Sequence, residues 1–195
     1  QWTVPGASYL WRETMGRMTS TSRFVNVSDG GHIENLGVYS LLERRCKLII
    51  AVDAEADPAM AFPSLTRLIR YARVDFGIRI DIDVDPIRAD HDGFHGAHWT
   101  VGHIDYGDGA TGVLCYLKLS MTGDEQMDVL AYRTSSPAFP HESTAEQFFS
   151  EVQFEAYRSL GEHIGRRVFD PAMGVTSSAA LAAALSKIGT GEIDA

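Results

Sequence analysis

The segment at residues 46–54, CKLIIAVDA, constrains the fold of this chain more than any other. Its central residues are apolar at consecutive positions, a pattern typical of a strand buried on both faces in the middle of a parallel sheet. A strand is also predicted at residues 23–27, and helices at residues 35–45 and 58–71 follow the two strands in turn. This order of strand, turn, helix, strand and helix predicts an α/β fold with a mainly parallel sheet.

The rest of the chain predicts an antiparallel part and a further helix. Apolar and charged side chains alternate over residues 78–85, which indicates a strand with one buried face. Two apolar runs joined by the Gly-Asp-Gly sequence at residues 107–109 predict a hairpin, so the sheet is expected to be mixed. A long helix is predicted at residues 144–167, with a capping box that begins at Ser143. Residues 170–195 are expected to form a tail whose alanine-rich middle is a short helix and whose ends fray.

Length and composition limit the classes of protein to which the chain can belong. A chain of 195 residues suits one domain, which we expect at residues 1–169, ahead of the tail at residues 170–195. The formal net charge of −9 argues against binding to nucleic acid and gives no attraction to an anionic membrane surface. Two cysteines are too few for a disulfide framework.

Targeting signals are not evident in the sequence. The longest apolar runs are far shorter than the roughly 18 residues that a membrane-spanning helix needs, and no signal peptide is recognisable. Because the sequence begins without methionine, we expect it to be part of a longer protein. That parent protein is expected to be cytoplasmic or membrane-associated.

Residues 26–37, NVSDGGHIENLG, place an acid on a glycine turn between a predicted strand and a predicted helix. In α/β sheets this end of a strand is where ligands bind. Gly30 and Gly31 are expected to take positive φ and to leave the space around Asp29 clear. A carboxylate held at the start of a helix can accept a proton from a hydroxyl group. The same residues are typical of an ordinary β-turn with aspartate at its first position, so the spacing leaves both interpretations open.

A family resemblance favours the functional interpretation of this turn. Residues 26–58 resemble the C-terminal half of patatin-like phospholipases, and residues 139–161 resemble the downstream part of the large bacterial branch of that family. In the family, a D-G-G or D-G-A motif supplies the acid of a Ser-Asp dyad. The resemblance therefore implies a three-layer α/β/α hydrolase core in which Asp29 is a catalytic residue.

The sequence departs from the family pattern in two respects. No G-x-S-x-G nucleophile motif and no glycine-rich oxyanion loop occur in these 195 residues. The resemblance then implies that the serine lies in an upstream part of the same polypeptide, that the substrate is a lipid or acyl ester, and that this chain alone is inactive. Membrane contact is expected through the parent protein. The alternative is a non-catalytic patatin-like scaffold or lipid-binding module.

Two residues that follow the glycine turn are candidates for supporting roles. His32 is interpreted as a hydrogen-bonding residue that braces the turn, because the resemblance implies a dyad without histidine; a triad that includes His32 is the alternative. Asn35 is predicted to cap the following helix and so to steady the loop that carries Asp29.

Three acids lie at the end of the strand at residues 46–54 and just after it, and they have the composition of a magnesium site: Asp53, Glu55 and Asp57. No phosphate-binding glycine motif accompanies them. We therefore interpret them as a polar loop in which Asp57 opens the next helix.

A second polar segment is dense in residues that can bind zinc: Asp90, His91, Asp92, His95, His98 and His103. Two glycines interrupt any helix that would place His91 and His95 on one face. His98 and His103 fall on opposite faces of the strand that follows. A polar loop is predicted, and neither a metal nor another cofactor is expected.

Overall fold

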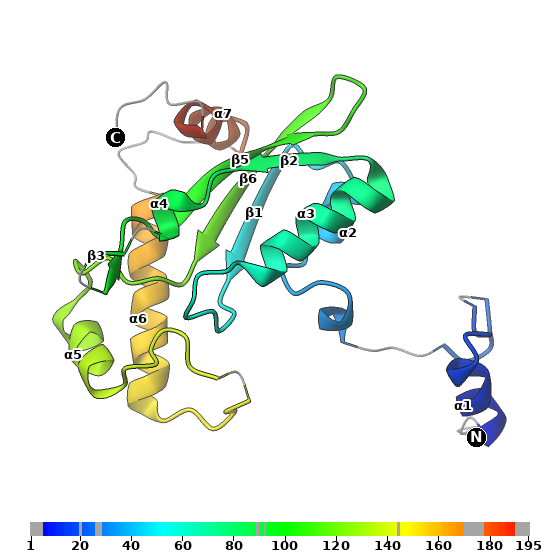
Figure 1. Cartoon of the computed structure of the whole chain (residues 1–195), viewed down its shortest axis with the longest axis horizontal. Coiled ribbons are helices and arrows are strands. Elements are labelled where there is room, and N and C mark those ends of the chain that lie inside the picture. The colour runs from blue at the N-terminus through cyan, green and yellow to red at the C-terminus, as the bar shows by residue number, and fades with distance from the viewer. Residues whose placement is uncertain are drawn as a thin grey trace. The chain divides into compact units, whose positions relative to one another are not determined.

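The computed structural model describes residues 6–19, 21–25, 29–88, 90–91, 93–143, 145–169 and 178–189. The chain separates into two compact units, Gln1–Asn35 and Leu36–Ala195 (Figure 1). The predicted domain boundary between residues 169 and 170 stays a prediction, since residues 170–177 are outside the described ranges.

The unit Gln1–Asn35 has little regular structure within its described residues. Helix α1 spans Ala7–Thr14 and buries none of its side chains. The predicted strand at residues 23–27 is wrong for its described part, because residues 23–25 have irregular backbone; its last two positions are outside the described ranges. A 3₁₀ helix, Gly30–His32, follows the predicted catalytic acid.

The unit Leu36–Ala195 is built on a four-stranded sheet with the order β1-β6-β5-β2 (Figure 1). The strands are β1, Leu48–Asp53; β2, Arg79–Ile82; β5, Trp99–Asp105; and β6, Thr111–Lys118. β1 is parallel to β6, whereas β5 is antiparallel to both β6 and β2. The α/β class, the mixed sheet and the hairpin are therefore confirmed. Only one of these three pairings is parallel, so the described strands do not form a mainly parallel sheet.

Strand β1 lies at an edge of the described sheet rather than at its centre. Ile49 and Ala51 are each 1% exposed, but Ile50 is 41% exposed and Val52 is 64% exposed. The prediction of a strand buried on both faces is therefore wrong for this chain. Because side chains alternate along a strand, Ile50 and Val52 lie on the same face as Leu48, which packs against the second hydrophobic core.

Two helices cover one face of the sheet and form the first hydrophobic core, α2 at Tyr39–Glu43 and α3 at Pro63–Phe76. Helix α2 is shorter than predicted, because Gly37 has a φ of +69° and the helix begins only after it. Helix α3 begins five residues later than the predicted position 58. Its bounds follow from Pro63, whose fixed φ suits a first turn, and from Gly77, whose φ of +67° ends the helix.

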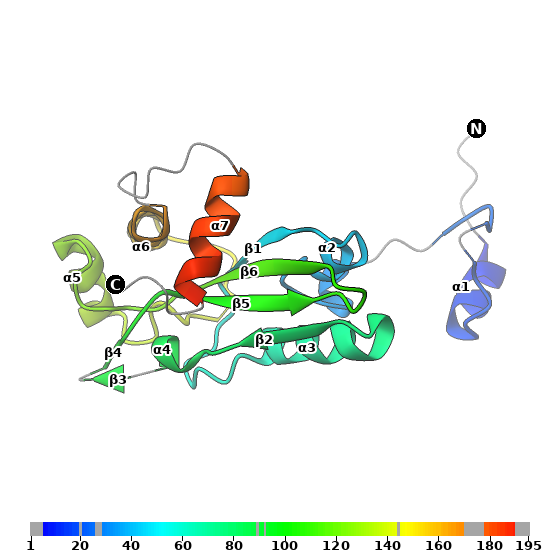
Figure 2. The ribbon, with the colours of Figure 1, turned by 90° about the horizontal axis from the view of Figure 1, so that it is seen from above.

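Helices α6, Glu151–Val168, and α7, Ser178–Gly189, lie on the opposite face of the sheet from α3 (Figure 2). The predicted helix at residues 144–167 is confirmed as α6 but begins later. Its cap is Ser150, whose hydroxyl accepts a hydrogen bond from the Gln153 N–H at 3.2 Å, so the capping box does not begin at Ser143. The alanine-rich helix expected in the tail is α7.

The apolar side chains in the first turn of α6 are exposed, Val152 by 66% and Phe154 by 62%. The side chains that α6 buries lie further along the helix: Ala156, Ser159, Leu160, Ile164 and Val168. Leu185 of α7 is fully buried in the same core.

Four shorter elements complete the described structure. Helix α4, Asp85–Arg88, is followed by strands β3, Asp90–His91, and β4, Phe94–His95, which pair in antiparallel fashion. Helix α5, Met127–Ser135, was not predicted. Among the described residues, no helix is long and apolar enough to cross a membrane.

Candidate functional site

Asp29 is the N-cap of the 3₁₀ helix Gly30–His32 and lies in an exposed turn. Its Oδ1 atom accepts a hydrogen bond from the Gly31 N–H at 3.0 Å. The carbonyl oxygen of Gly30 in turn accepts hydrogen bonds from the backbone of Ile33 at 2.9 Å and of Glu34 at 3.0 Å. The turn therefore holds the Asp29 carboxylate in a defined orientation at the surface of its unit.

The predicted reason for the two glycines of the turn is wrong, and of the two only Gly31 has a close neighbour. Neither Gly30 nor Gly31 is among the residues with positive φ, so that expectation is wrong. A Cβ atom at Gly31 would lie 2.7 Å from Asn35 Oδ1 and 3.5 Å from Asp29 Oδ1. A Cβ atom at Gly30 would meet nothing within 4 Å. A side chain at position 31 would therefore displace the end of the Asn35 side chain, whereas one at position 30 would meet no neighbour.

The two predicted supporting residues lie in the same unit as Asp29. Asn35 does not cap α2, whose N-cap is Val38. Its side-chain oxygen instead lies beside Gly31, 2.7 Å from where a Cβ atom at that position would be. His32 is exposed, and its backbone N–H donates to the Asp29 carbonyl oxygen at 3.2 Å. The catalytic role of Asp29 and the supporting roles of its neighbours stay predictions.

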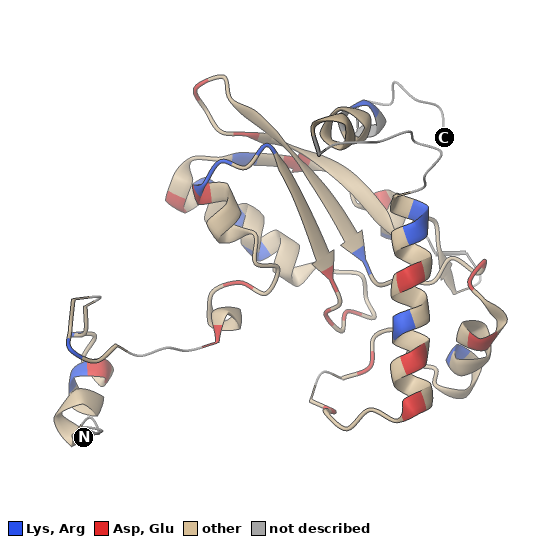
Figure 3. Cartoon of the chain, turned by 180° about the vertical axis from the view of Figure 1, so that it is seen from behind, with Lys and Arg blue, Asp and Glu red and all other residues tan. Residues whose placement is uncertain are grey.

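The acids that follow β1 are engaged by other groups of the protein. Asp53 is 1% exposed, and its Oδ1 atom lies 3.0 Å from the Nζ atom of the fully buried Lys118. Charges of opposite sign accordingly mark the adjacent ends of β1 and β6 (Figure 3). The Tyr116 hydroxyl also donates to Asp53. Burial, and then the Asp53 charge, raise the pKa of that hydroxyl above its ordinary value. A lysine ammonium thus occupies the position that a metal ion would take beside Asp53.

The other two acids of this group also have protein partners. Asp57 accepts hydrogen bonds from the backbone N–H groups of Ala61 at 3.0 Å and Phe62 at 2.7 Å, directly before α3. Glu55 accepts one from the Ser64 hydroxyl at 2.6 Å. Residues 54–57 form a loop as predicted, but Asp53 is the last residue of β1. The prediction that Asp57 opens the next helix is wrong, because α3 begins at Pro63 and its N-cap is Phe62.

His141 lies against the same loop. Its Nδ1 atom accepts a hydrogen bond from the Asp57 N–H at 3.3 Å. Burial, and then the neighbouring Lys118 charge, lower the pKa of His141 to about 4. The imidazole is therefore neutral near pH 7, although no sequence pattern singled it out.

Several residues of the histidine segment lie in strands, where a polar loop was predicted. His91 lies in β3, His95 in β4 and His103 in β5, whereas Asp92 is outside the described ranges. His98 is 4% exposed and directly precedes β5. Among the described residues of this segment, His98 is the one that lies close to potential metal ligands from other parts of the chain.

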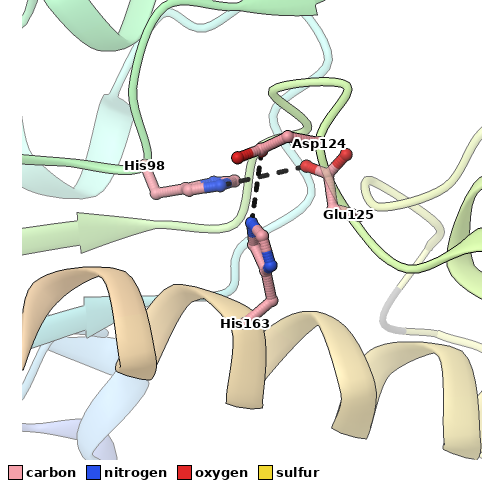
Figure 4. Close-up of side chains that lie close together, drawn as sticks. All are labelled: His98, Asp124, Glu125 and His163. Atoms are coloured by element: carbon pink, nitrogen blue, oxygen red, sulfur yellow. Dashed lines mark ion pairs between the residues drawn. The ribbon is translucent and has the colours of Figure 1, made fainter. Parts of the chain in front are cut away.

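Those ligands form a cluster that we call the histidine–acid cluster: His98, Asp124, Glu125 and His163 (Figure 4). His98 Nε2 lies 3.8 Å from Glu125 Oε1, and His163 Nε2 lies 3.3 Å from Asp124 Oδ1. The two imidazole rings meet edge to face, with centroids 5.3 Å apart. Burial lowers the pKa of His98 to about 4 against the opposing effect of Glu125, so this ring is neutral near pH 7.

No protein-family model, curated protein or solved structure matches the chain. The resemblance to patatin-like phospholipases therefore stays a prediction. The geometry of the Asp29 turn and the composition of the histidine–acid cluster are the two observations on which functional proposals can rest.

Proposed function

We propose that this chain supplies the acid of a Ser-Asp dyad in a lipid acyl hydrolase. In this proposal Asp29 is the general base, and the nucleophilic serine belongs to an upstream part of the same polypeptide. The observation that carries the proposal is the exposed turn at the D-G-G motif, in which the Gly31 N–H holds the Asp29 carboxylate at 3.0 Å. A base fixed in this way requires little reorganisation when it accepts a proton.

The proposed reaction needs few groups from this chain. The serine hydroxyl attacks the ester carbonyl of the lipid, and its proton passes to Asp29 as the new C–O bond forms. The bond between the acyl carbon and the alcohol oxygen breaks, the alcohol leaves with the proton that Asp29 had accepted, and an acyl-enzyme remains. Asp29 then accepts a proton from the water that attacks the acyl-enzyme and returns it to the serine oxygen as the fatty acid leaves.

The edge of the sheet supports the proposal that the parent protein contains further segments of the core. β1 has a partner strand on one side only among the described residues. Its side chains Ile50 and Val52 are exposed on the face that α6 and α7 cover elsewhere. An added strand, with a helix above it, would bury both side chains and complete the β1 hydrogen bonds.

One feature favours the alternative of a lipid-binding module without catalysis. Four apolar side chains around the start of α6 are strongly exposed: Phe148 at 93%, Phe149 at 50%, Val152 at 66% and Phe154 at 62%. Exposed apolar residues that follow one another so closely are typical of surfaces that bind lipids or other proteins.

The decisive test uses the parent protein with its upstream segment and measures hydrolysis of p-nitrophenyl acyl esters. Asp29→Asn should lower the rate by about 10²–10⁴, because the amide cannot accept the serine proton. The turn should persist, since the asparagine oxygen can still accept from the Gly31 N–H. Asp128→Asn, a matched change of an exposed acid on α5, should leave the rate unchanged.

Other outcomes distinguish the alternatives. Equal losses in Asp29→Asn and His32→Ala would favour a triad that includes His32. A fully active Asp29→Asn enzyme would contradict the proposed function. An inactive parent whose residues 1–195 bind phosphatidylcholine vesicles would instead support the lipid-binding module. Esterase activity of residues 1–195 alone, sensitive to serine-directed inhibitors, would contradict the placement of the nucleophile upstream.

A further inference from the structure

The histidine–acid cluster draws its members from three separate elements of the fold. His98 precedes β5, Asp124 and Glu125 lie on the connection between β6 and α5, and His163 lies on α6 (Figure 4). One nitrogen or oxygen atom from each residue lies within 4.8 Å of the corresponding atoms of the others. Ligands around a tetrahedral zinc ion are about 3.4 Å apart, given bond lengths of about 2.0–2.2 Å. The spacings of 3.3 Å and 3.8 Å within the cluster are close to that value.

The Ser120 hydroxyl contacts the ring nitrogen of His98 that faces away from the cluster. Ser120 Oγ lies 3.1 Å from the Ala97 carbonyl oxygen and 3.3 Å from the Lys118 carbonyl oxygen. Carbonyl oxygens only accept, so when the single hydroxyl hydrogen is donated to one of them, the Nδ1 atom of His98, 3.0 Å from Ser120 Oγ, is the donor in its contact with the hydroxyl. In the neutral ring this leaves a lone pair on Nε2, which faces the cluster.

The cluster contains more hydrogen-bond acceptors than donors. The single hydroxyl hydrogen of Thr122 faces three acceptors: His98 Nε2 at 2.9 Å, Asp124 Oδ1 at 2.5 Å and Glu125 Oε1 at 3.3 Å. It can satisfy only one of them at a time. His163 Nε2 is buried and makes no hydrogen bond, although Asp124 Oδ1 is 3.3 Å away. One hydroxyl hydrogen therefore faces acceptor atoms of His98, Asp124 and Glu125 together.

The charges of the cluster also favour a cation. The Glu125 carboxylate is fully buried, where the backbone N–H groups of Thr122 at 2.6 Å and Gly123 at 2.9 Å hold it. Asp124 pairs with Arg167 through its other oxygen. Two carboxylates against one guanidinium leave an excess of negative charge among these three side chains, which a divalent ion can compensate.

We propose that His98, Asp124, Glu125 and His163 bind a divalent transition-metal ion, and that Zn²⁺ is the ion best suited to them. Two imidazole nitrogens with two carboxylate oxygens match the ligands of zinc, whereas Ca²⁺ and Mg²⁺ prefer oxygen ligands throughout. His98, Thr122, Asp124 and Arg167 line an open cavity, so an ion could exchange with solvent. The site does not depend on the proposed role of Asp29.

The test measures Zn²⁺ binding to the 195-residue chain, purified without a polyhistidine tag and stripped of metal by a chelator. Calorimetric titration should give one ion per chain. His163→Gln and Asp124→Asn should each weaken binding by at least about 100-fold, because each removes a ligand. Ser120→Ala should weaken it by about 10–100-fold, because it frees the His98 ring that Ser120 orients. His103→Gln, a matched change on β5, should bind Zn²⁺ like the unaltered chain.

Co²⁺ provides a second measurement that a purely structural role for these residues would not affect. The Co²⁺-loaded chain should show the visible absorption of a four-coordinate nitrogen and oxygen site, and Ser120→Ala should alter that spectrum. The proposal is overturned if the unaltered chain shows no saturable binding, or if His163→Gln and Asp124→Asn both retain it. Should His163→Gln fail to fold by circular dichroism, Asp124→Asn and Ser120→Ala decide the question by the same criteria.

Discussion

Replacing Lys118 by methionine tests the buried ion pair at the end of β1 and β6. The Lys118 ammonium lies 3.0 Å from Asp53, and the two side chains are 0% and 1% exposed. Methionine fills most of the volume of the lysine stem but leaves the Asp53 carboxylate buried without its counter-charge. Breaking one partner of a buried pair in this way costs about 3–5 kcal/mol of unfolding free energy.

The surroundings of Asp53 place the expected cost at the lower end of that range. The Tyr116 hydroxyl and the Glu55 N–H still donate to the carboxylate after the change. We therefore expect a loss of about 3 kcal/mol. For a unit of this size, that loss lowers the melting temperature by about 6–12 °C.

The assay is urea denaturation at pH 7, followed by circular dichroism. Lys118→Met, Asp53→Asn and the double variant form a cycle, and the double variant should be less destabilised than the sum of the two single changes. Lys47→Met, at an exposed lysine, should stay within about 0.5 kcal/mol of the unaltered chain. The reasoning is refuted if Lys118→Met loses less than about 1 kcal/mol, or if the two changes are additive.

Two further predictions follow from contacts of the described residues. If the parent protein hydrolyses esters as proposed, Gly31→Ala should lower that hydrolysis by about 10–100-fold, because its Cβ atom collides with the Asn35 side chain beside the turn, whereas Gly30→Ala should be near neutral. The reverse ranking would contradict the role assigned to the close contact. The folded-state pKa of His141 is about 4, below the ordinary value of 6.5, so the unfolded chain binds more protons between these values. Stability is therefore complete above about pH 6.5 and falls as the pH drops toward 4, by up to about 2–3 kcal/mol for this partly buried group. The urea midpoint should fall between pH 7 and pH 4.5, and it should fall less in His141→Gln than in the unaltered chain. His98 accounts for part of the fall that remains in the variant. If the fall is the same in both proteins, His141 does not contribute to the pH dependence of stability.

The features that the sequence predicted correctly depend on short-range patterns. The hairpin follows from Gly107 and Gly109, which take the φ values of +90° and +83° that the turn requires. The apolar face of α3 follows from its helical period, and Leu65 and Leu68 are buried as that period predicts. Such signals are complete within a few residues and need no information about distant partners.

The features that the sequence missed depend on partners far along the chain. The composition of β1 is that of a central strand, but its place in the sheet is decided by which other strands pair with it. Asp29 was singled out correctly as the residue of an exposed glycine turn, whereas the contact between Asn35 and Gly31 was not foreseen. The histidine–acid cluster has no motif, because His98 and His163 come from distant elements that only tertiary packing brings together.

The pairing of β1 with β6 also has a consequence for the order in which the chain assembles. The register joins Leu48 to Val113 and Asp53 to Lys118 across α3, β2 and all of β5. Since synthesis proceeds from the N-terminus, β1 leaves the ribosome well before β6 exists, and such non-local contacts form slowly. During this interval both edges of an apolar strand are open to the nascent chain and to its neighbours. β1 therefore waits for its partner strand until most of this unit has been synthesised, and the ion pair between Asp53 and Lys118 forms only when β6 pairs with it.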